Sequence, residues 1–504
     1  MRVLREKPET SPVSSVDPEQ QYEYERDDAG AIAYDDDLGV PSLRNTTERK
    51  LVAKIDWRVI PLLCILYLLA FLDRINIGNA NIFGLSTDLQ LTGTKYNTAL
   101  VIFFVPYTIF EIPSNIILKK LRPSRWLSLC CFLFGLASIC QGLVSNYGGL
   151  LTTRFFLGLF ETGMFPGCFY LIGMWYRREE GQRRYSFFFS STTLAGAFGG
   201  LLAAAIGKMD YMRGYRGWRW IFILEGTLTC VVAIALFFLL PDFPEEAKWL
   251  TEEERAYVRA RLQADQGKSA RDRPITLRDV GRVFKDWKVF AGGLMYFGMI
   301  VPAYGYAYFS PTIIKNYGYS NVQTQLHSVP PWAAAFGFAM IIAYASDKTK
   351  HRFAFAVFPM LVCIAGFAIV LSVYGKAHRD TQYAALFLIA MGAYSAMPVV
   401  VCWFNMNLGG HHRRAVGTAW QVGFGNTGGF VAVYIFLTED APRFVTGYSV
   451  CLAMVCLSIL SSIVYLIGVM HANRVRNKSA RDVGLSETEK TELGDLSPDY
   501  RYLL

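Results

Sequence analysis

Apolar residues along the chain gather in blocks of about twenty, and short segments between the blocks hold nearly all the Lys and Arg residues. A helix of about twenty apolar residues is long enough to cross the roughly 30 Å hydrocarbon core of a bilayer. The pattern predicts an all-α polytopic membrane protein with about twelve transmembrane helices in two six-helix bundles. The expected spans are 57–79, 96–118, 125–144, 148–176, 184–207, 218–240, 289–314, 326–344, 352–374, 383–405, 415–437 and 445–471.

The spans fall into two sets, separated by a polar and charged stretch. Within that stretch, the sequence from Thr251 to Arg255 (TEEER) is typical of a capped surface helix. The first 50 residues are rich in Asp, Glu, Pro and Ser, which is typical of a disordered tail. The expected organisation is a tail (1–50), an N-terminal bundle (51–240), a central cytoplasmic loop (241–288), a C-terminal bundle (289–471) and a second tail (472–504).

Composition agrees with the membrane pattern, since 53% of the 504 residues are hydrophobic and only 18% are charged. Such a chain is too apolar for a soluble multidomain protein. The net charge of +9 does not indicate a nucleic-acid partner, because the cations cluster at the ends of spans. Most of these clusters lie on one side, which predicts that both termini are cytoplasmic; the cluster from Arg213 to Arg219 is the exception.

Motifs for soluble chemistry are missing from the sequence. Most of the ten cysteines lie inside apolar spans without metal-ligand spacing, so core packing is the expected role. There is no phosphate-binding Gly-Lys-Ser/Thr loop, no metal-spaced His/Cys set and no nucleophile elbow. The sequence therefore indicates neither an enzyme nor an ATP-driven pump, and no cofactor or metal is expected.

Two similar stretches indicate internal duplication. Arg183 and Arg184 precede Gly199 and Gly200 in the first half, and an Arg-Arg pair at 413–414 precedes Gly-Gly at 428–429. Small residues let helices approach closely, and transporters built from repeated helix sets use such faces for rocking motions. Simple packing is the equally weighted alternative.

Charged side chains inside lipid-spanning helices are costly, so those that occur are the best indication of a functional site. They all lie in the first half of the chain: Asp73, Arg74, Glu111, Arg154, Glu161 and Glu225.

Depth in the membrane suggests a partner for the first of these charges. The helical rise places Asp73 about 24 Å from the start of the first span and Arg154 about 9 Å from the outer end of the oppositely directed fourth span. In a core of about 30 Å these heights agree to within a few Å. The sequence thus predicts an Asp73–Arg154 ion pair and leaves Arg74 without an assigned partner.

Arg74 is the expected substrate-binding group, because a free guanidinium beside a cavity offers a planar fork to a carboxylate. Glu161 lies two helical turns from Arg154 on the same face, near the expected midplane. Burial favours the neutral form of a carboxyl, so Glu161 is the proton-coupling candidate. The alternative is that these four charges only cross-link the first and fourth spans.

Other candidates carry weaker arguments. Glu111, near a cytoplasmic span end, is expected to act in gating or helix packing, and Glu225 to pair with Arg216 or Arg219. In the second half, Tyr304, Tyr306 and Tyr308 cannot all share one helical face, so only part of the set can line a cavity. The substrate-binding candidates of that half are Tyr304 and Asn426, and a lone His327 is expected to pack structurally.

Several motifs in order resemble the major facilitator superfamily, and most closely its anion:cation symporter branch and the fungal permeases for allantoate, nicotinate and related acids. They are 71–78 (FLDRINIG), 111–115 (EIPSN), 121–126 (LRPSRW), 154–167 (RFFLGLFETGMFPG), 217–226 (GWRWIFILEG), 240–244 (LPDFP), 248–251 (KWLT) and 414–419 (RAVGTA). The resemblance covers roughly residues 50 to 475.

This resemblance implies proton-coupled import of a small carboxylate by alternating access, with Asp73, Arg74, Arg154 and Glu161 forming the binding and coupling network. The superfamily's usual loop between the second and third spans has an Asp that is missing here, although Asp347, followed by Lys348, preserves a version after the eighth span and is a gating candidate. The Pro-Gly signature of drug:proton antiporters is also missing from the fifth span, which argues against drug efflux.

The leading hypothesis is therefore a monomeric plasma-membrane symporter whose partners are a small carboxylate, protons and the lipid bilayer. An exporter or vacuolar carrier of a metabolite on the same fold is the first alternative. A nutrient sensor is the second, disfavoured by the short central loop. The particular anion does not follow from the sequence.

Overall fold

The computed structural model describes residues 34–35, 40–41, 46–266, 277–349, 351–409, 411–479 and 500–503. Nearly all of the expected N-terminal tail lies outside these residues. Its described part contains two short strands, β1 (Tyr34–Asp35) and β2 (Val40–Pro41), paired antiparallel. Everything else of regular structure in the described residues is helical.

The N-terminal bundle is built from the helices before the central segment. They are α1 (Glu48–Ile82), α2 (Leu85–Asp88), α3 (Lys95–Lys120), α4 (Pro123–Gly142), α5 (Tyr147–Glu161), α6 (Met164–Trp175), α7 (Arg178–Ile206) and α8 (Gly217–Leu239), with 3-10 turns η2 (Gly207–Met209) and η3 (Met212–Gly214).

The C-terminal bundle follows the central segment. It comprises α11 (Trp287–Lys315), α12 (Asn321–Thr349), α13 (Arg352–Ser372), α14 (Arg379–Met406), α15 (His411–Asn426), α16 (Gly428–Tyr434) and α17 (Val445–Ser479), with 3-10 turns η5 (Lys376–His378) and η6 (Thr438–Asp440).

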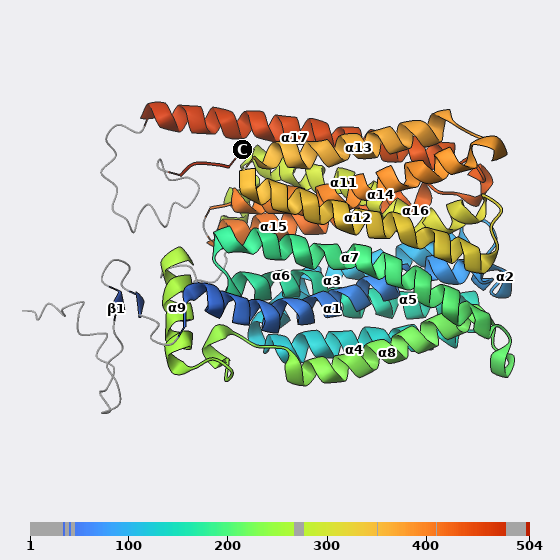
Figure 1. The fold of residues 1–504 in the computed structure, drawn as a ribbon, viewed down its shortest axis with the longest axis horizontal. Helices are drawn as coiled ribbons and strands as arrows, with labels where there is room; N and C mark the ends of the chain where they lie inside the picture. The colour runs from blue at the N-terminus through green and yellow to red at the C-terminus, as the bar shows by residue number, and fades with distance from the viewer. Residues whose placement is uncertain are drawn as a thin grey trace, which may run out of the picture.

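Each expected span coincides with one helix or with two consecutive helices, and the predicted all-α membrane fold is confirmed. In the described residues, 10 helices are long and apolar enough to cross a membrane. The remaining two expected spans coincide with α3 and with the α15–α16 pair. Figure 1 shows the long helices running side by side, with α1 to α8 in one layer and α11 to α17 in the other.

Two of the expected spans are interrupted. The fourth breaks between α5 and α6 at Thr162 and Gly163, and the eleventh breaks between α15 and α16 at Thr427. Glu161 and Asn426 are the last helical residues before these breaks. Both breaks are slight, because Thr162, Gly163 and Thr427 keep right-handed helical dihedral angles.

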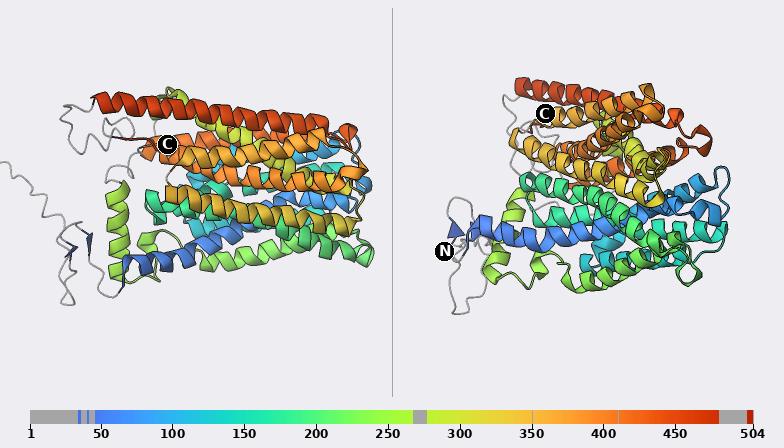
Figure 2. Two further views of the ribbon diagram at one scale, coloured as in Figure 1. Left: turned by 45° about the horizontal axis from the view of Figure 1, so that its top comes forward. Right: turned by 45° about the vertical axis from the view of Figure 1, so that its right-hand side comes forward.

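Figure 2 shows the two bundles packed against each other in two further views. The expected glycines lie where the bundles meet. A Cβ added to Gly200 of α7 would lie 2.6 Å from Ser328 Oγ of α12, and one added to Gly429 of α16 would lie 2.5 Å from the Phe104 ring of α3. The glycines of both repeats therefore permit close packing between the bundles, as their duplication suggested.

Two contacts join the bundles on one side of the molecule's centre. The end at which α1 begins and α17 ends is named the terminal end, and the other is the far end. Near the far end, Asn97 of α3 donates a 2.6 Å hydrogen bond to the Val433 carbonyl of α16. A Cβ on Gly78 of α1 would lie 2.7 Å from the Tyr308 carbonyl of α11. The bundles are thus in close contact on the far side of the molecule's centre.

The central segment contains η4 (Pro244–Glu246), α9 (Glu252–Gln266) and α10 (Leu277–Phe284), with residues 267–276 outside the described part. The predicted capped helix is confirmed at α9, where the Glu254 backbone N–H donates to Thr251 Oγ1 at 3.2 Å and the Thr251 N–H donates to Glu254 Oε2 at 3.0 Å. These reciprocal bonds satisfy two backbone donors that a helix start otherwise leaves unpaired.

The expected C-terminal tail, 472–504, begins inside a helix. The last transmembrane helix, α17, stays helical to Ser479, so its 35 residues extend about 50 Å and project beyond a 30 Å core. The end of the tail is also structured, since residues 500–503 lie against the C-terminal bundle.

Candidate functional site

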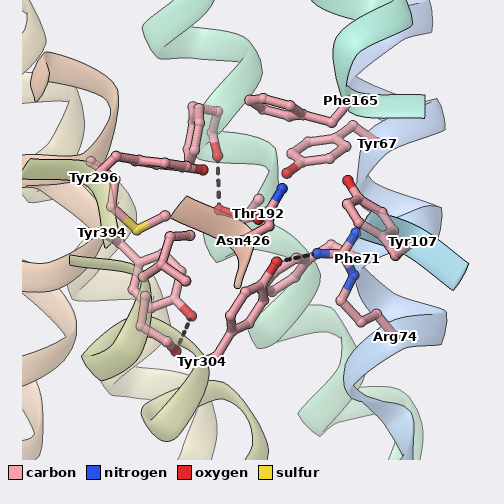
Figure 3. A pocket seen from close by; sticks show the side chains of 14 residues that line it. Tyr67, Phe71, Arg74, Tyr107, Phe165, Thr192, Tyr296, Tyr304, Tyr394 and Asn426 are labelled. Carbon is pink, nitrogen blue, oxygen red and sulfur yellow. Dashed lines mark hydrogen bonds between the residues drawn. The ribbon is translucent and has the colours of Figure 1, made fainter. Parts of the chain in front are cut away.

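A small cavity lies between the two bundles near the middle of the helices (Figure 3). The volume open to the centre of a water molecule is about 20 Å³, enough for one or two waters. Its walls are mainly aromatic, and the lining residues are Tyr67, Phe71, Arg74, Tyr107, Phe165, Phe189, Thr192, Tyr296, Ile300, Ala303, Tyr304, Tyr394, Met397 and Asn426. Side chains must therefore move before a carboxylate of any size can enter.

Arg74 is the one cationic residue among those lining residues and is only 2% exposed. Its Nε donates to Glu161 Oε1 at 2.9 Å, and its Nη2 donates to the same oxygen. Its Nη1 donates to the Tyr304 hydroxyl of the other bundle (Figure 3). The expectation that Arg74 has no partner is wrong for this conformation. The Glu161 carboxylate accepts from its Nε and Nη2, and the Tyr304 hydroxyl accepts from its Nη1.

Asp73 faces away from the cavity and does not form the expected ion pair with Arg154. Its Oδ1 accepts a 3.0 Å hydrogen bond from Ser138 of α4, and its Oδ2 accepts one of 3.1 Å from Thr229 of α8. The carboxyl is thus buried among neutral donors inside the N-terminal bundle.

Arg154 is fully buried and reaches the backbone next to Asp73, in agreement with the depth estimate for these two residues. It donates to backbone carbonyls instead of a carboxylate, with Nε 3.3 Å from the Ala99 oxygen and Nη1 3.4 Å from the Arg74 oxygen. Its guanidinium also lies 5.4 Å from the Phe103 ring centroid. The predicted depth of Arg154 was right, but the predicted ion pair with Asp73 was wrong. Helical rise fixes the depth of a residue but not the direction in which its side chain points.

The directions in which neighbouring side chains point from α1 explain why Arg74, and not Asp73, pairs with a charged residue of α5. Consecutive residues on a helix point about 100° apart, so Asp73 and Arg74 cannot both face α5. Arg74 takes the cavity face together with Tyr67 and Phe71, which precede it by about two turns and one turn. Asp73 is left facing α4 and α8.

Both candidates of the second half line the cavity. Tyr304 contacts Arg74 directly, and Asn426 lies 4% exposed in the cavity wall (Figure 3). As expected, the neighbouring tyrosines do not share this face completely: Tyr306 packs against Trp332 with ring centroids 5.1 Å apart. Tyr308 stacks on Tyr304 at 5.9 Å without lining the cavity.

Most residues of the aromatic wall were not predicted from the sequence. Tyr67 and Phe71 could have been found from their spacing of seven and three residues before Arg74, which puts them on its face. Tyr107 precedes Glu111 by four residues in the same way. Tyr296 and Tyr394 carry no such local signal, since charges that would mark their helix faces are absent from the expected spans around them.

Glu225 does not pair with Arg216 or Arg219 as expected. It is 2% exposed and accepts a hydrogen bond from Asn76 Nδ2, one turn beyond Asp73 on α1. The two arginines instead pair with Asp88, with Arg219 Nη2 3.3 Å from Asp88 Oδ2. Helix α8 turns its Glu225 face towards α1, which removes it from the surface arginines.

The gating candidates lie outside the cavity. Glu111 of α3 is 5% exposed, and a Cβ on Gly423 of α15 would lie 3.6 Å from its Oε2, which puts the carboxyl between the bundles. Asp347 lies in the last turn of α12 and pairs with Arg352, with Oδ1 3.0 Å from Nη1. His327 stacks on Tyr319 at 4.1 Å and contacts the Gln323 carbonyl, away from the cavity residues.

Comparison with known families identifies the fold. The Major Facilitator Superfamily profile matches residues 63–433, which is most of the chain. The chain belongs to the major facilitator superfamily. As a member of this superfamily it is a multi-pass membrane transporter of small solutes and not an enzyme.

Curated relatives are fungal transporters, which confirms the resemblance to fungal permeases of this superfamily. The chain is 37% identical over 410 residues to the MFS transporter prlL of a fungal species (strain NRRL 50135), covering 79% of this chain and 82% of that protein. It is 31% identical over 471 residues to the high-affinity nicotinic acid transporter of Saccharomyces cerevisiae, covering 93% and 87%. It is 32% identical over 465 residues to the major facilitator-type transporter hxnP of Emericella nidulans, covering 91% and 93%.

Solved structures agree on the fold. The proton:xylose symporter XylE matches with a TM-score of 0.61 at 14% identity, over 81% of this chain and 95% of that one. A bacterial homologue of the human lysosomal transporter Spinster matches with a TM-score of 0.60 at 14% identity, over 84% and 97%. At this level of identity the likeness concerns the fold alone.

Proposed function

We propose that this transporter imports a small organic anion together with a proton, by alternating access. Arg74 binds the substrate carboxylate and Glu161 carries the proton. The observation that carries the proposal is the buried Arg74–Glu161 pair at the cavity, in which a carboxylate of the protein occupies the position that a substrate carboxylate needs.

Competition for Arg74 couples the two ligands. While Glu161 is charged, it holds the Nε and Nη2 donors of Arg74. Protonation removes most of that attraction and frees the planar fork for the substrate. Proton and anion then each increase the affinity for the other, since such coupling is reciprocal. A transporter with this coupling carries both ligands in the same direction.

Tyr304 connects this event to the opening of the far end. Its hydroxyl accepts from Arg74, which joins α1 of one bundle to α11 of the other. When Arg74 turns towards a substrate, this link between the bundles weakens. Rocking of the two bundles about the central site then exposes the cavity to the other side.

The cavity favours a planar monocarboxylate. Among the lining residues Arg74 is the single cation, while Tyr67, Tyr107 and Tyr296 contribute aromatic faces that suit a flat ring. Nicotinate has this chemistry, and the 31% identical yeast relative is a nicotinic acid transporter, which supports the proposal. Import across the plasma membrane with the terminal end cytoplasmic completes the hypothesis.

The direct test is uptake of radiolabelled nicotinate into proteoliposomes of known protein orientation. An inwardly directed proton gradient should drive accumulation, and nicotinamide, which lacks the carboxylate, should not compete. Allantoate, pantothenate, biotin and dicarboxylates follow in the same assay as alternative substrates. Accumulation that does not depend on the gradient would contradict proton coupling, and net efflux would favour the exporter.

Glu161→Gln isolates the coupling step. The variant keeps an oxygen that can accept from Arg74 but cannot lose a proton, so it should exchange preloaded substrate and fail to accumulate it. Glu225→Gln is the matched control, because Glu225 is also buried in the same bundle but accepts its hydrogen bond from Asn76 and not from Arg74. Equal loss of accumulation in both variants would remove Glu161 from its role.

A further inference from the structure

The last described residues of the chain lie in a built site on the terminal end of the C-terminal bundle. Residues 500–503 contact α11, α14 and α17, and Tyr502 is only 5% exposed. Figure 1 marks this end of the chain beside α17. None of the described tail residues or of the residues that they contact lines the cavity.

Two asparagines bind the backbone of consecutive tail residues. Asn473 of α17 donates to the Tyr502 carbonyl and accepts from the Tyr502 N–H, both at 3.0 Å. Asn407, at the end of α14, donates to the Leu503 carbonyl at 3.0 Å and accepts from the Leu503 N–H at 2.7 Å. Trp403 Nε1 adds a 3.0 Å bond to the same Leu503 carbonyl. Each asparagine thus pairs with the N–H and the C=O of one residue, as a neighbouring strand would.

Side chains of the tail add specificity to this backbone pairing. The Tyr502 ring lies 4.2 Å from Lys288 Nζ and 4.6 Å from the Arg476 guanidinium carbon, and its hydroxyl accepts from Lys288 at 2.8 Å. The Tyr500 hydroxyl donates to the Met406 carbonyl at 3.0 Å. Cation–π contacts and a satisfied buried hydroxyl favour aromatic residues at these two positions.

We propose that this surface is a receptor for the chain's own C-terminal segment and that docking straps the terminal ends of α11, α14 and α17 together. The strap holds Asn407, the residue from which the chain turns into α15. Helix α15 carries Asn426 of the cavity wall and Gly423 beside Glu111 of the other bundle. Docking therefore fixes the start of a C-terminal-bundle helix that faces the other bundle.

Every tail contact named above lies within the C-terminal bundle, so the strap can remain in place while the bundles rock. It keeps three helices moving as one body, which is what rigid-body alternating access requires. The inference rests on the tail geometry and does not depend on the identity of the substrate.

The test uses the full chain and a variant that ends at residue 499. The truncated protein should melt at a lower temperature and should exchange backbone hydrogens faster around residues 400–409 and 466–479 than the full chain. A synthetic pentapeptide of residues 500–504 should bind it and restore both properties. A peptide with Ala in place of Tyr502 should bind at least about tenfold more weakly.

Receptor variants separate docking from general loss of stability. Asn473→Ala should reproduce the effect of truncation and add little to it, because both remove the same contact. Asn477→Ala, one turn further along α17 and exposed, is the control and should change neither property. Peptide that fails to bind the truncated protein, or full additivity of truncation and Asn473→Ala, would overturn the proposal.

Discussion

Arg74 and Glu161 form a buried ion pair in which both the Nε and the Nη2 of the arginine point at one carboxylate oxygen. The second carboxylate oxygen, Oε2, has no hydrogen-bond partner among the described residues. The third arm of the guanidinium crosses to Tyr304 of the other bundle. The pair is therefore both the charged centre of the cavity and a link between the two halves of the transporter.

The Tyr304 link can be measured by removing one hydroxyl. Tyr304→Phe leaves a buried donor of Arg74 without an acceptor, which should lower the stability of this conformation by about 1–3 kcal/mol. Tyr306→Phe on the same helix is the control, because the Tyr306 hydroxyl has no hydrogen-bond partner among the described residues. Thermal unfolding of the purified variants tests both; equal melting temperatures for the two variants would refute the link.

Substitution of Asp73 tests whether its carboxyl interacts only with the neutral hydroxyls of Ser138 and Thr229. Asp73→Asn keeps an acceptor for one hydroxyl and a donor for the other, since the Ser138 and Thr229 hydroxyls can rotate. The change in unfolding free energy should stay below about 1 kcal/mol, whereas Asp73→Ala should cost more. A loss of about 3–5 kcal/mol for Asp73→Asn would instead indicate a buried cation that depends on the charge.

Close packing between α3 and α5 depends on Gly158. A Cβ at this position would lie 2.1 Å from the Phe103 carbonyl oxygen, which belongs to the backbone and cannot move alone. Gly158→Ala should therefore destabilise the protein by about 1–3 kcal/mol or prevent folding. Gly337→Ala in α12 is the matched control, because nothing lies within 4 Å of its Cβ position. That variant should be neutral or stabilising by up to about 1 kcal/mol. Thermal unfolding measures both variants, and equal melting temperatures for Gly158→Ala and Gly337→Ala would contradict the prediction.

The central helix α9 should give a pH-dependent contribution to stability through Glu254. Burial alone would raise the pKa of Glu254, but hydrogen bonds from Lys54 and from the Thr251 backbone hold it below its ordinary value. A carboxyl with a lowered folded-state pKa stabilises the fold above its unfolded pKa of about 4.3, and this contribution is lost as the pH falls further.

The measurement compares melting temperatures of the unchanged protein and Glu254→Gln across pH. The difference should be largest near neutral pH and should shrink below about pH 4.3. Glu252→Gln, an exposed neighbour in the same first turn, should show a smaller difference at neutral pH. A Glu254→Gln difference that is constant with pH would show that the charge of Glu254 contributes nothing.

Much of the fold follows directly from the sequence. Blocks of apolar residues specify the membrane helices because a helix satisfies its own backbone hydrogen bonds in lipid, where no water can do so. The Thr251 and Glu254 pairing was predictable because a capping box depends only on residues three apart. The charged residues of the cavity were predictable for a related reason, since burying Arg74 or Glu161 in a membrane helix is too costly without a role.

Partners and directions were decided only by the tertiary structure. Residue spacing gave the correct depth for Arg154, but whether Asp73 or Arg74 faces α5 depends on how α1 is rotated against its neighbours, and packing sets that rotation. Tyr304 meets Arg74 across 230 residues, and Leu503 meets Asn407 across 96. The sequence by itself thus determined which segments enter the membrane and which charges matter there, because those are properties of single helices. The partners of the buried charges and of the C-terminal residues depend on how the helices pack together, so only the folded chain fixes them.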